Sequence, residues 1–291
     1  MQRIVCIAHV HYPDLWPELA ACMKIALKGG GDAIITYSDE SSVRQARADL
    51  PDARFVQCEN VGFDIWPFLK VLDEIDLSGY TYVVKLHTKR DVPPEPRIEF
   101  NGMDCTGPAW RNELLSFVST PEAWRASLAK IAEPEVSAVA GLRCILRRRD
   151  VPMQPTRAAF DRALELARAI GLDPADPQFV GGTMFIMRAE CLRPLQGRWR
   201  ASDFSAPQGH ETRTLAHLVE RIIGFCACGG GRISDPFGAL ARYRRKVFWL
   251  RCLRGVVRFA WQAKRTRDGR LLIKVLRVPV WRSGRGKGRV A

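Results

Sequence analysis

The sequence has no apolar run that approaches the roughly 18 residues of a membrane-spanning helix. It also lacks low-complexity tracts and internal repeats, which excludes fibrous and wholly disordered classes and favours a globular protein. The first residues, MQRIVCIAHVHY, form too short an apolar run for a signal peptide, since Pro13 and Asp14 follow directly. We therefore expect a cytoplasmic protein, soluble or peripheral to the inner face of the cell membrane.

Patterns typical of metal sites are missing as well. The nine cysteines are scattered, and Cys226-Ala-Cys228 has no second pair at zinc-site spacing. The odd number and the scatter favour free thiols in a reducing compartment. No Asp-x-Asp pair follows a predicted strand. His9 and His11 alternate at the end of one, where a metal pair is one interpretation, and one packed and one cleft-facing ring is the favoured one. We predict no metal site, and dependence on a divalent metal stays open.

Acidic residues almost disappear after Gly238. From there to the C-terminus the sequence has 17 Lys and Arg residues and a single acidic residue, Asp268, so this segment carries a net charge of +16. The net charge of the whole chain is +14. The first 237 residues are therefore nearly neutral, which argues against a nucleic-acid-binding body. We predict an α/β domain over 1–237 and a basic, partly amphipathic helical tail over 238–291, with a disordered end. Aromatic side chains among these cations suit an anionic membrane surface.

Short apolar runs alternate with segments of helical period in the first part of the chain. The predicted strands are 4–10, 33–37, 54–58, 82–86, 136–140 and 179–187, and the predicted helices are 15–27, 43–50, 65–75, 109–132 (with a possible break at Pro121), 158–170 and 211–223. Continuous apolar strands are typical of sheets that are buried on both faces. The alternation predicts a mostly parallel central sheet with right-handed crossovers.

Two loops at one edge of this sheet carry the strongest functional signal. His87, Thr88 and Lys89 directly follow a buried strand, and ligands of open α/β sheets bind beyond the carboxyl ends of strands. Asn60, Gly62 and Asp64 lie in the loop after the preceding strand. A solvated turn explains Lys89 alone, and a helix cap explains Asp64 alone. Together these residues predict a site for a phosphorylated ligand.

Two further segments are candidates for the same cleft. Gly181, Gly182 and Thr183 lie within a predicted strand, where interior glycine marks either a bulge or the close approach of a ligand or another backbone. Glu211 begins a predicted helix and is a candidate general base. The competing explanation is that the helix dipole simply favours an acidic residue in the first turn of the helix. The same dipole lowers the pKa of that carboxyl group, which makes it a weaker base.

Five segments resemble the rhamnan synthesis F family of bacterial polysaccharide glycosyltransferases: HVHYPDLWPEL, NVGFDIWPFL, YTYVVKLHTKRD, VGGTMFIMRAECLRPL and TLAHLVERIIG. They occur in the family's order and span about residues 9–224. The resemblance implies a GT-A-like nucleotide-sugar fold and transfer of rhamnose from a nucleoside-diphosphate donor, dTDP-rhamnose, to a polysaccharide or lipid-linked glycan. The chain departs from the family pattern at Ile186 and at Thr212-Arg213, which leaves the base open between Glu211 and Asp64.

The resemblance also implies positions for the site residues. His9, Asn60, Gly62, Asp64, His87, Thr88 and Lys89 would line the donor site, and Gly182, Thr183, His217 and Glu220 would face the acceptor or close the cleft. We therefore expect an enzyme, a glycosyltransferase without a specific nucleic-acid partner. A non-catalytic nucleotide-sugar- or carbohydrate-binding protein of a polysaccharide assembly system is the alternative.

Overall fold

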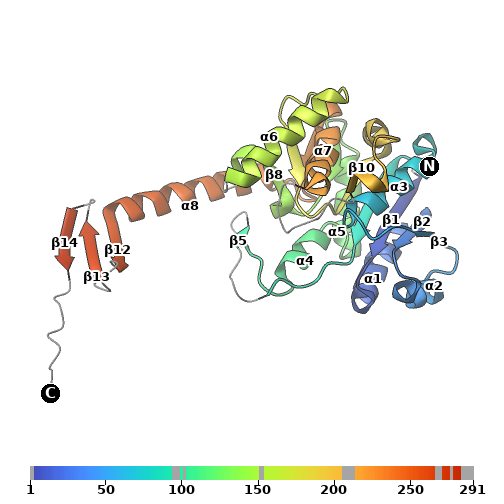
Figure 1. The fold of residues 1–291 in the computed structure, drawn as a ribbon, viewed down its shortest axis with the longest axis horizontal. Helices are drawn as coiled ribbons and strands as arrows, with labels where there is room; N and C mark the ends of the chain where they lie inside the picture. The colour runs from blue at the N-terminus through green and yellow to red at the C-terminus, as the bar shows by residue number, and fades with distance from the viewer. Residues whose placement is uncertain are drawn as a thin grey trace, which may run out of the picture. The chain divides into compact units, whose positions relative to one another are not determined.

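The structure is a computed structural model, and it describes residues 3–93, 99–100, 103–150, 154–204, 214–265, 271–275 and 278–282. The chain divides into two compact units, Met1–Leu240 and Ala241–Ala291 (Figure 1). Within the described residues, no helix is both long and apolar enough to cross a bilayer. All nine cysteines are free thiols.

A seven-stranded sheet forms the centre of the first unit. Its order is β11-β7-β10-β4-β1-β2-β3, where the strands are β1 (Ile4–Val10), β2 (Asp32–Tyr37), β3 (Arg54–Gln57), β4 (Tyr82–His87), β7 (Val136–Val139), β10 (Phe185–Arg188) and β11 (Arg232–Ser234). Every neighbouring pair is parallel except the two pairs that include β10. The predicted α/β class with a mostly parallel sheet is therefore confirmed.

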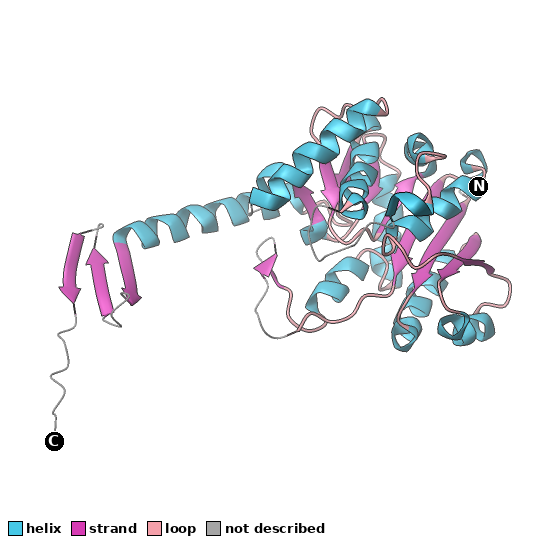
Figure 2. Ribbon diagram, in the orientation of Figure 1, coloured by secondary structure: helices cyan, strands magenta, loops and turns pink. Residues whose placement is uncertain are grey.

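The helices of the first unit lie on both sides of this sheet (Figure 2). They are α1 (Trp16–Leu27), α2 (Arg44–Asp49), α3 (Ile65–Glu74), α4 (Ala109–Leu115), α5 (Pro121–Ile131), α6 (Gln154–Ala169) and α7 (Leu215–Gly230). α1 packs with α2 and α5, whereas α3 packs with α7. All seven residues of β1 are buried, as expected of a strand covered on both faces.

The strand order reverses between β1 and β4. The chain runs outward from β1 through β2 to β3, and α3 then returns it to the other side of β1. Because crossovers between parallel strands are right-handed, this reversal places α1 and α2 on one face and α3 on the other, which agrees with their positions in Figure 1. Loops leaving the carboxyl ends of β1 and β4 therefore diverge, and they leave a crevice at the switch point.

One sequence prediction is wrong in this unit, and another is confirmed in its detail. The predicted strand 179–187 is two strands, β9 (Gln178–Val180), which pairs with β8 (Ile145–Arg147), and β10, separated by a turn. Gly182 and Thr183 in that turn have φ of 81° and 47°, which no strand contains. The possible break at Pro121 in the predicted helix 109–132 is confirmed: α5 begins at Pro121, where the Thr120 hydroxyl caps it by accepting a hydrogen bond from the Ala123 N–H.

The second unit contains most of α8 (Leu240–Ala260) and a three-stranded antiparallel sheet of β12 (Trp261–Arg265), β13 (Leu271–Val275) and β14 (Val278–Arg282). The prediction of a helical tail did not foresee these strands. Runs such as LLIKV and VPVWR are rich in the β-branched and aromatic residues that strands favour. The predicted disordered end, from residue 283 onward, lies outside the described residues. The remaining short strands, β5 (Glu99–Phe100) and β6 (Met103–Asp104), pair in the first unit.

Candidate donor-binding site

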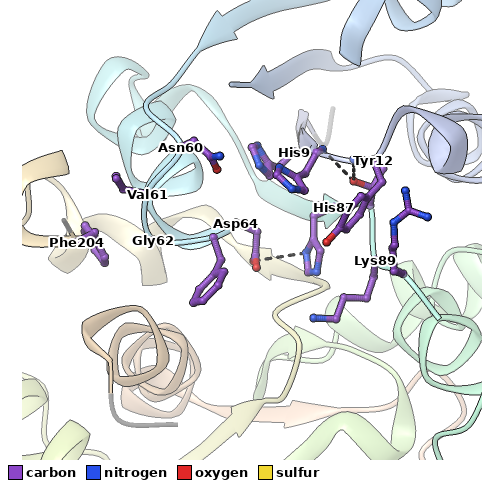
Figure 3. Close-up of a pocket in the computed structure, with 13 residues that line it drawn as sticks. His9, Tyr12, Asn60, Val61, Gly62, Asp64, His87, Lys89 and Phe204 are labelled. Carbon is purple, nitrogen blue, oxygen red and sulfur yellow. Dashed lines mark hydrogen bonds and ion pairs between the residues drawn. The ribbon is translucent and has the colours of Figure 1, made fainter. Parts of the chain in front are cut away.

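A cavity of about 610 Å³ opens at the switch point between β1 and β4 (Figure 3). Its walls come from the loops that follow β1, β3 and β4, together with Phe204. The lining includes His9, His11, Tyr12, Asn60, Val61, Gly62, Phe63, Asp64, His87, Thr88, Lys89 and Arg90. The predicted loops 60–64 and 87–89 therefore meet at one site, although they belong to strands that are not neighbours in the sheet.

Backbone contacts fix the loops after β1 and β4 against each other. His9 and His87 are register partners at the ends of these strands. The Thr88 hydroxyl accepts hydrogen bonds from the N–H groups of His11 and Tyr12, each at 3.0 Å, and the Thr88 N–H donates to the His9 carbonyl. Thr88 thus holds the cavity wall in shape and also lines the cavity, so its predicted contact with the ligand stays a prediction.

A charged network lies beneath the cavity. The Lys85 ammonium donates to an Asp64 carboxylate oxygen and, at 2.8 Å, to the Thr183 hydroxyl. The Thr183 hydroxyl in turn donates to the same carboxylate at 2.6 Å. His87 Nδ1 lies 3.4 Å from that Asp64 oxygen, within ion-pair distance. The side chains of Lys85 and Asp64 are 2% and 19% exposed, so their charges are largely desolvated.

Asp64 does not cap the helix that it precedes. It occupies the N-cap position of α3, but its side chain makes no capping hydrogen bond and turns toward Lys85. An N-cap aspartate ordinarily accepts from the first free N–H groups of its helix. The structure therefore disfavours the capping explanation for Asp64 and assigns its carboxylate to the buried network.

Two strained turns bring this network together. Phe63 and Thr183 are non-glycine residues with positive φ, of 56° and 47°, and each follows a glycine with positive φ. For a β-branched residue such as Thr183 this conformation is unfavourable, and strain of this kind clusters at functional sites. Side chains also enclose Gly182, since an added Cβ would lie 2.5 Å from Leu114. The close approach expected at this glycine is therefore an approach of protein atoms.

Burial and ion pairing decide which side chains of the cavity floor are charged and which are neutral. Burial alone would raise the pKa of Asp64, but His87, Lys85 and the Thr183 hydroxyl hold it well below its usual range. Burial lowers the pKa of Lys85, and the adjacent Asp64 opposes that shift. Burial also lowers the pKa of His9 to about 4 and that of His87 to about 3. At neutral pH the floor therefore holds a Lys85–Asp64 ion pair beside two neutral imidazoles.

These two buried histidines should make the protein less stable in mild acid. Unfolding restores their ordinary pKa of about 6.5, so below that pH the unfolded chain binds protons that the native state rejects. The stabilisation is complete above pH 6.5 and decreases as the pH falls toward the native values of about 4 and 3. Each histidine should cost about 1.4 kcal/mol of unfolding free energy per pH unit.

Urea unfolding of wild type and of a His9→Asn/His87→Asn variant, at several pH values between 7 and 5, measures this effect. The variant should lose less stability across that interval because asparagine does not titrate. Parallel curves for the two proteins would show that other groups cause the acid sensitivity.

Lys89 is a cation of the cavity wall whose charge is available to a ligand, because the neighbouring arginines are paired with acidic side chains. Arg90 pairs with Asp14 at 3.1 Å and lies over the Tyr12 ring, so its charge is already used. Arg111 pairs with Glu18 and Asp91 and donates to the Lys89 carbonyl, which fixes the backbone at this point. Within the described part of the chain, no acidic side chain pairs with the Lys89 ammonium group, which projects toward the cavity in Figure 3.

The other predicted residues surround this floor. Asn60 is exposed at the rim, and the Gly182 N–H donates to the Glu220 carboxylate at 2.7 Å. His217 contacts the ring of Phe63 at a centroid distance of 5.7 Å. His9 is buried and His11 is exposed, which matches the favoured interpretation of that pair. Glu211 lies outside the described residues.

Sequence reasoning missed Lys85 altogether. A lysine in the middle of Tyr-Val-Val-Lys-Leu, an otherwise apolar buried strand, was the available signal, because a charge at such a position needs a partner. Within the described residues, no group of three or more His, Cys, Asp or Glu side chains is placed to hold a metal ion.

Comparison with known proteins connects this fold to a family. A family model described as rhamnan synthesis protein F matches residues 1–231. Two curated relatives, both named uncharacterized protein WxcX and from two strains of Xanthomonas campestris pv. campestris, are 31% and 33% identical over 177 and 178 residues. These matches cover 60% of this chain and 24% of each relative, so the matched part spans about a quarter of the relatives' length.

A crystal structure of S. aureus TarS, residues 1–349, aligns with 81% of this chain and 58% of its own. Its sequence identity is 10% and its TM-score is 0.37, a score too low to establish a shared fold. The family model, in contrast, includes six of the seven strands of the central sheet, all except β11, and every strand whose loop lines the cavity. On the strength of that match, the chain belongs to the rhamnan synthesis protein F family, whose name denotes the synthesis of a polysaccharide.

Proposed function

We propose that the first unit is a glycosyltransferase that moves a sugar from a nucleoside-diphosphate donor to a growing polysaccharide or lipid-linked glycan. Rhamnose, carried by dTDP-rhamnose, is the sugar that the family name favours. The observation that carries the proposal is Lys89, which has no acidic partner among the described residues, beside a cavity of about 610 Å³ at the switch point of the sheet. Cavities of about 300–1,000 Å³ are the usual size for small-molecule ligands.

The sheet supports a GT-A-like fold for this unit. The donor cavity lies at the carboxyl ends of the parallel strands β1 and β4, and the antiparallel β10 separates them from β7 and β11. β10 therefore enters from the rim of the cavity, which allows the turn before it to contribute to the site. We propose that the first four strands bind the nucleotide and that the segment from β9 to α7 faces the acceptor.

In the proposed reaction an acceptor hydroxyl loses its proton and its oxygen attacks the anomeric carbon of the donor sugar. The bond from that carbon to the diphosphate oxygen breaks, and the electron pair leaves with the nucleotide. Lys89 stabilises the charge that develops on the diphosphate. Asp64 is a poor base for the first step, because its pKa is held well below the usual range and its carboxylate already accepts two hydrogen bonds.

A screen of nucleotide sugars tests the proposal. A bound donor stabilises the native state by mass action, by about 2.7 kcal/mol at a hundred times its dissociation constant. We expect dTDP-rhamnose to raise the melting temperature and to release dTDP slowly through transfer to water. Arg162→Ala, on an exposed side chain of α6, serves as a control variant.

The outcomes of the screen separate the candidate functions. Stabilisation without release of nucleotide, even when glycan acceptors are added, would favour the non-catalytic binding protein. No stabilisation and no release with any nucleotide sugar would contradict both functions.

We further propose that the second unit attaches the protein to the cytoplasmic face of an anionic membrane. Phe248, Trp249 and Leu253 on α8 are 61%, 69% and 60% exposed. Residues 238–291 also carry 17 Lys and Arg residues. Basic segments gain about 1 kcal/mol per cation near an anionic surface, and exposed aromatic side chains bury themselves in its interface.

Co-sedimentation with vesicles measures this attachment. The full chain should pellet with phosphatidylserine vesicles and far less with phosphatidylcholine vesicles. A Phe248→Ser/Trp249→Ser/Leu253→Ser variant keeps every cation and should pellet less than wild type. Equal pelleting of the two proteins, or equal pelleting with both lipids, would contradict the proposal.

A further inference from the structure

His217 lies in the first turn of α7, beside the cavity. Its ring packs edge-to-face with the ring of Phe63, a cavity-lining residue that is 51% exposed and has a strained backbone. The Nδ1 atom of His217 lies 2.6 Å from the Thr214 hydroxyl. One ring nitrogen is therefore fixed by a neighbour, and among the described residues no hydrogen-bond partner lies at Nε2.

The hydrogen bond between the Thr214 hydroxyl and His217 Nδ1 comes at the expense of the helix. Thr214 is the N-cap residue of α7, yet its side chain makes no capping hydrogen bond. Loss of such a cap costs about 1 kcal/mol of stability. The Thr214 hydroxyl instead fixes the orientation of the His217 ring, and the N-terminus of α7 has no side-chain cap.

A buried arginine holds the same turn. The Arg221 guanidinium is buried, lies over the Phe179 ring at 5.0 Å and donates to the His217 carbonyl. The charged groups that act on the His217 ring are Glu220 and Arg221 on α7, Asp64 before α3 and Lys89 after β4. Burial is the largest influence and lowers the pKa of His217, so the ring is neutral at neutral pH.

We propose that His217 is the catalytic base of the transfer reaction and that Thr214 is its positioning residue. Nε2 takes the proton of the acceptor hydroxyl while Nδ1–H donates to the Thr214 hydroxyl. The acceptor oxygen forms its bond to the anomeric carbon, and the diphosphate leaves with the electron pair of the bond that breaks. The base becomes an imidazolium, which later returns the proton to water. This inference rests on the proposed glycosyltransferase function.

The experiment compares wild type with His217→Ala, His217→Asn, Thr214→Val and Glu211→Gln. The readouts are the release of dTDP from dTDP-rhamnose, or of nucleoside diphosphate from whichever screened nucleotide sugar wild type cleaves fastest, and the melting-temperature shift produced by that donor. We expect His217→Ala to lower kcat by about 10² to 10⁴, as loss of a general base does, with the donor-induced shift unchanged. Added imidazole should restore part of the kcat of His217→Ala only.

The remaining variants decide between this base and the alternatives. Thr214→Val should lower kcat less than His217→Ala and move the acidic limb of the pH profile, whereas Glu211→Gln should stay within a few-fold of wild type. His217→Asn repeats the test if His217→Ala melts without cooperativity. Turnover near wild type in either His217 variant, or a loss confined to Glu211→Gln, would overturn the inference. Wild type that neither binds nor cleaves a nucleotide sugar would refute the proposed function first, and this base with it.

Discussion

Replacing Lys89 by alanine should lower turnover by about 10² or more, which is the usual effect of removing one group that stabilises developing charge. Lys89 follows β4 at the switch point, and its backbone carbonyl is fixed by Arg111. Within the described residues its ammonium group has no acidic partner, so its charge is available to a diphosphate. Because the charge on the leaving group grows as its bond breaks, the loss should appear in kcat more than in KM.

The neighbouring cation provides the comparison for this experiment. Arg90 also lines the cavity, but its guanidinium pairs with Asp14 and lies over the Tyr12 ring. Arg90→Ala should therefore reduce kcat far less than Lys89→Ala, and Lys89→Arg should retain part of the activity. A Lys89→Ala protein with turnover within a few-fold of wild type would rule out the role of Lys89 in leaving-group stabilisation.

Replacing Asp64 by alanine should destabilise the fold by about 3–5 kcal/mol, the usual cost of leaving one member of a buried ion pair without its partner. Lys85 is 2% exposed and extends from a central strand, so its ammonium group cannot reach water without disturbing the sheet. The Thr183 hydroxyl would remain its hydrogen-bond partner and would not compensate the charge. The free energy of unfolding, measured by urea titration, gives the cost directly.

Two further variants serve as controls for the stability measurement: one removes an exposed ion pair, and the other removes both charges of the buried pair. Asp32→Ala removes a pair with Arg3 whose side chains are 60% and 43% exposed, together with a hydrogen bond from the Tyr80 hydroxyl, so it should cost about 1–2 kcal/mol. Asp64→Leu/Lys85→Met removes both buried charges and should be more stable than Asp64→Ala alone. If the double variant is the less stable of the two, or if Asp64→Ala costs no more than Asp32→Ala, the buried pair does not determine stability as we expect.

Much of the first half of the fold was predictable from the sequence. The strand predicted at 4–10 matches β1, and those at 33–37, 54–58 and 82–86 match β2, β3 and β4 to within a residue at each end. Apolar runs of this length, separated by segments of helical period, leave few alternatives to a parallel sheet. The same reasoning brought the loops at 60–64 and 87–89 to one rim.

The second half was less predictable because its signals are not local. Phe179–Met187 is apolar apart from Gly181, Gly182 and Thr183, and its composition does not show that the chain turns at Gly182 and Thr183. Nor does it show that β10 runs antiparallel between β4 and β7. The Asp64 side chain points to Lys85, a partner 21 positions away, whereas sequence reasoning weighed a helix cap, a ligand contact and a catalytic base for it.

The position of β10 also has a consequence for synthesis on the ribosome. Lys85 meets Thr183 from 98 positions later in the chain, and until β10 arrives the edge of β4 has no partner on that side. A nascent chain therefore exposes every rim loop of the first four strands while the hydroxyl that completes the ion pair is still untranslated. Strand edges left open in this way invite pairing with other chains. The arrival of β10 therefore completes the floor of the cavity and also covers an unpaired edge of β4 at which the nascent chain could aggregate.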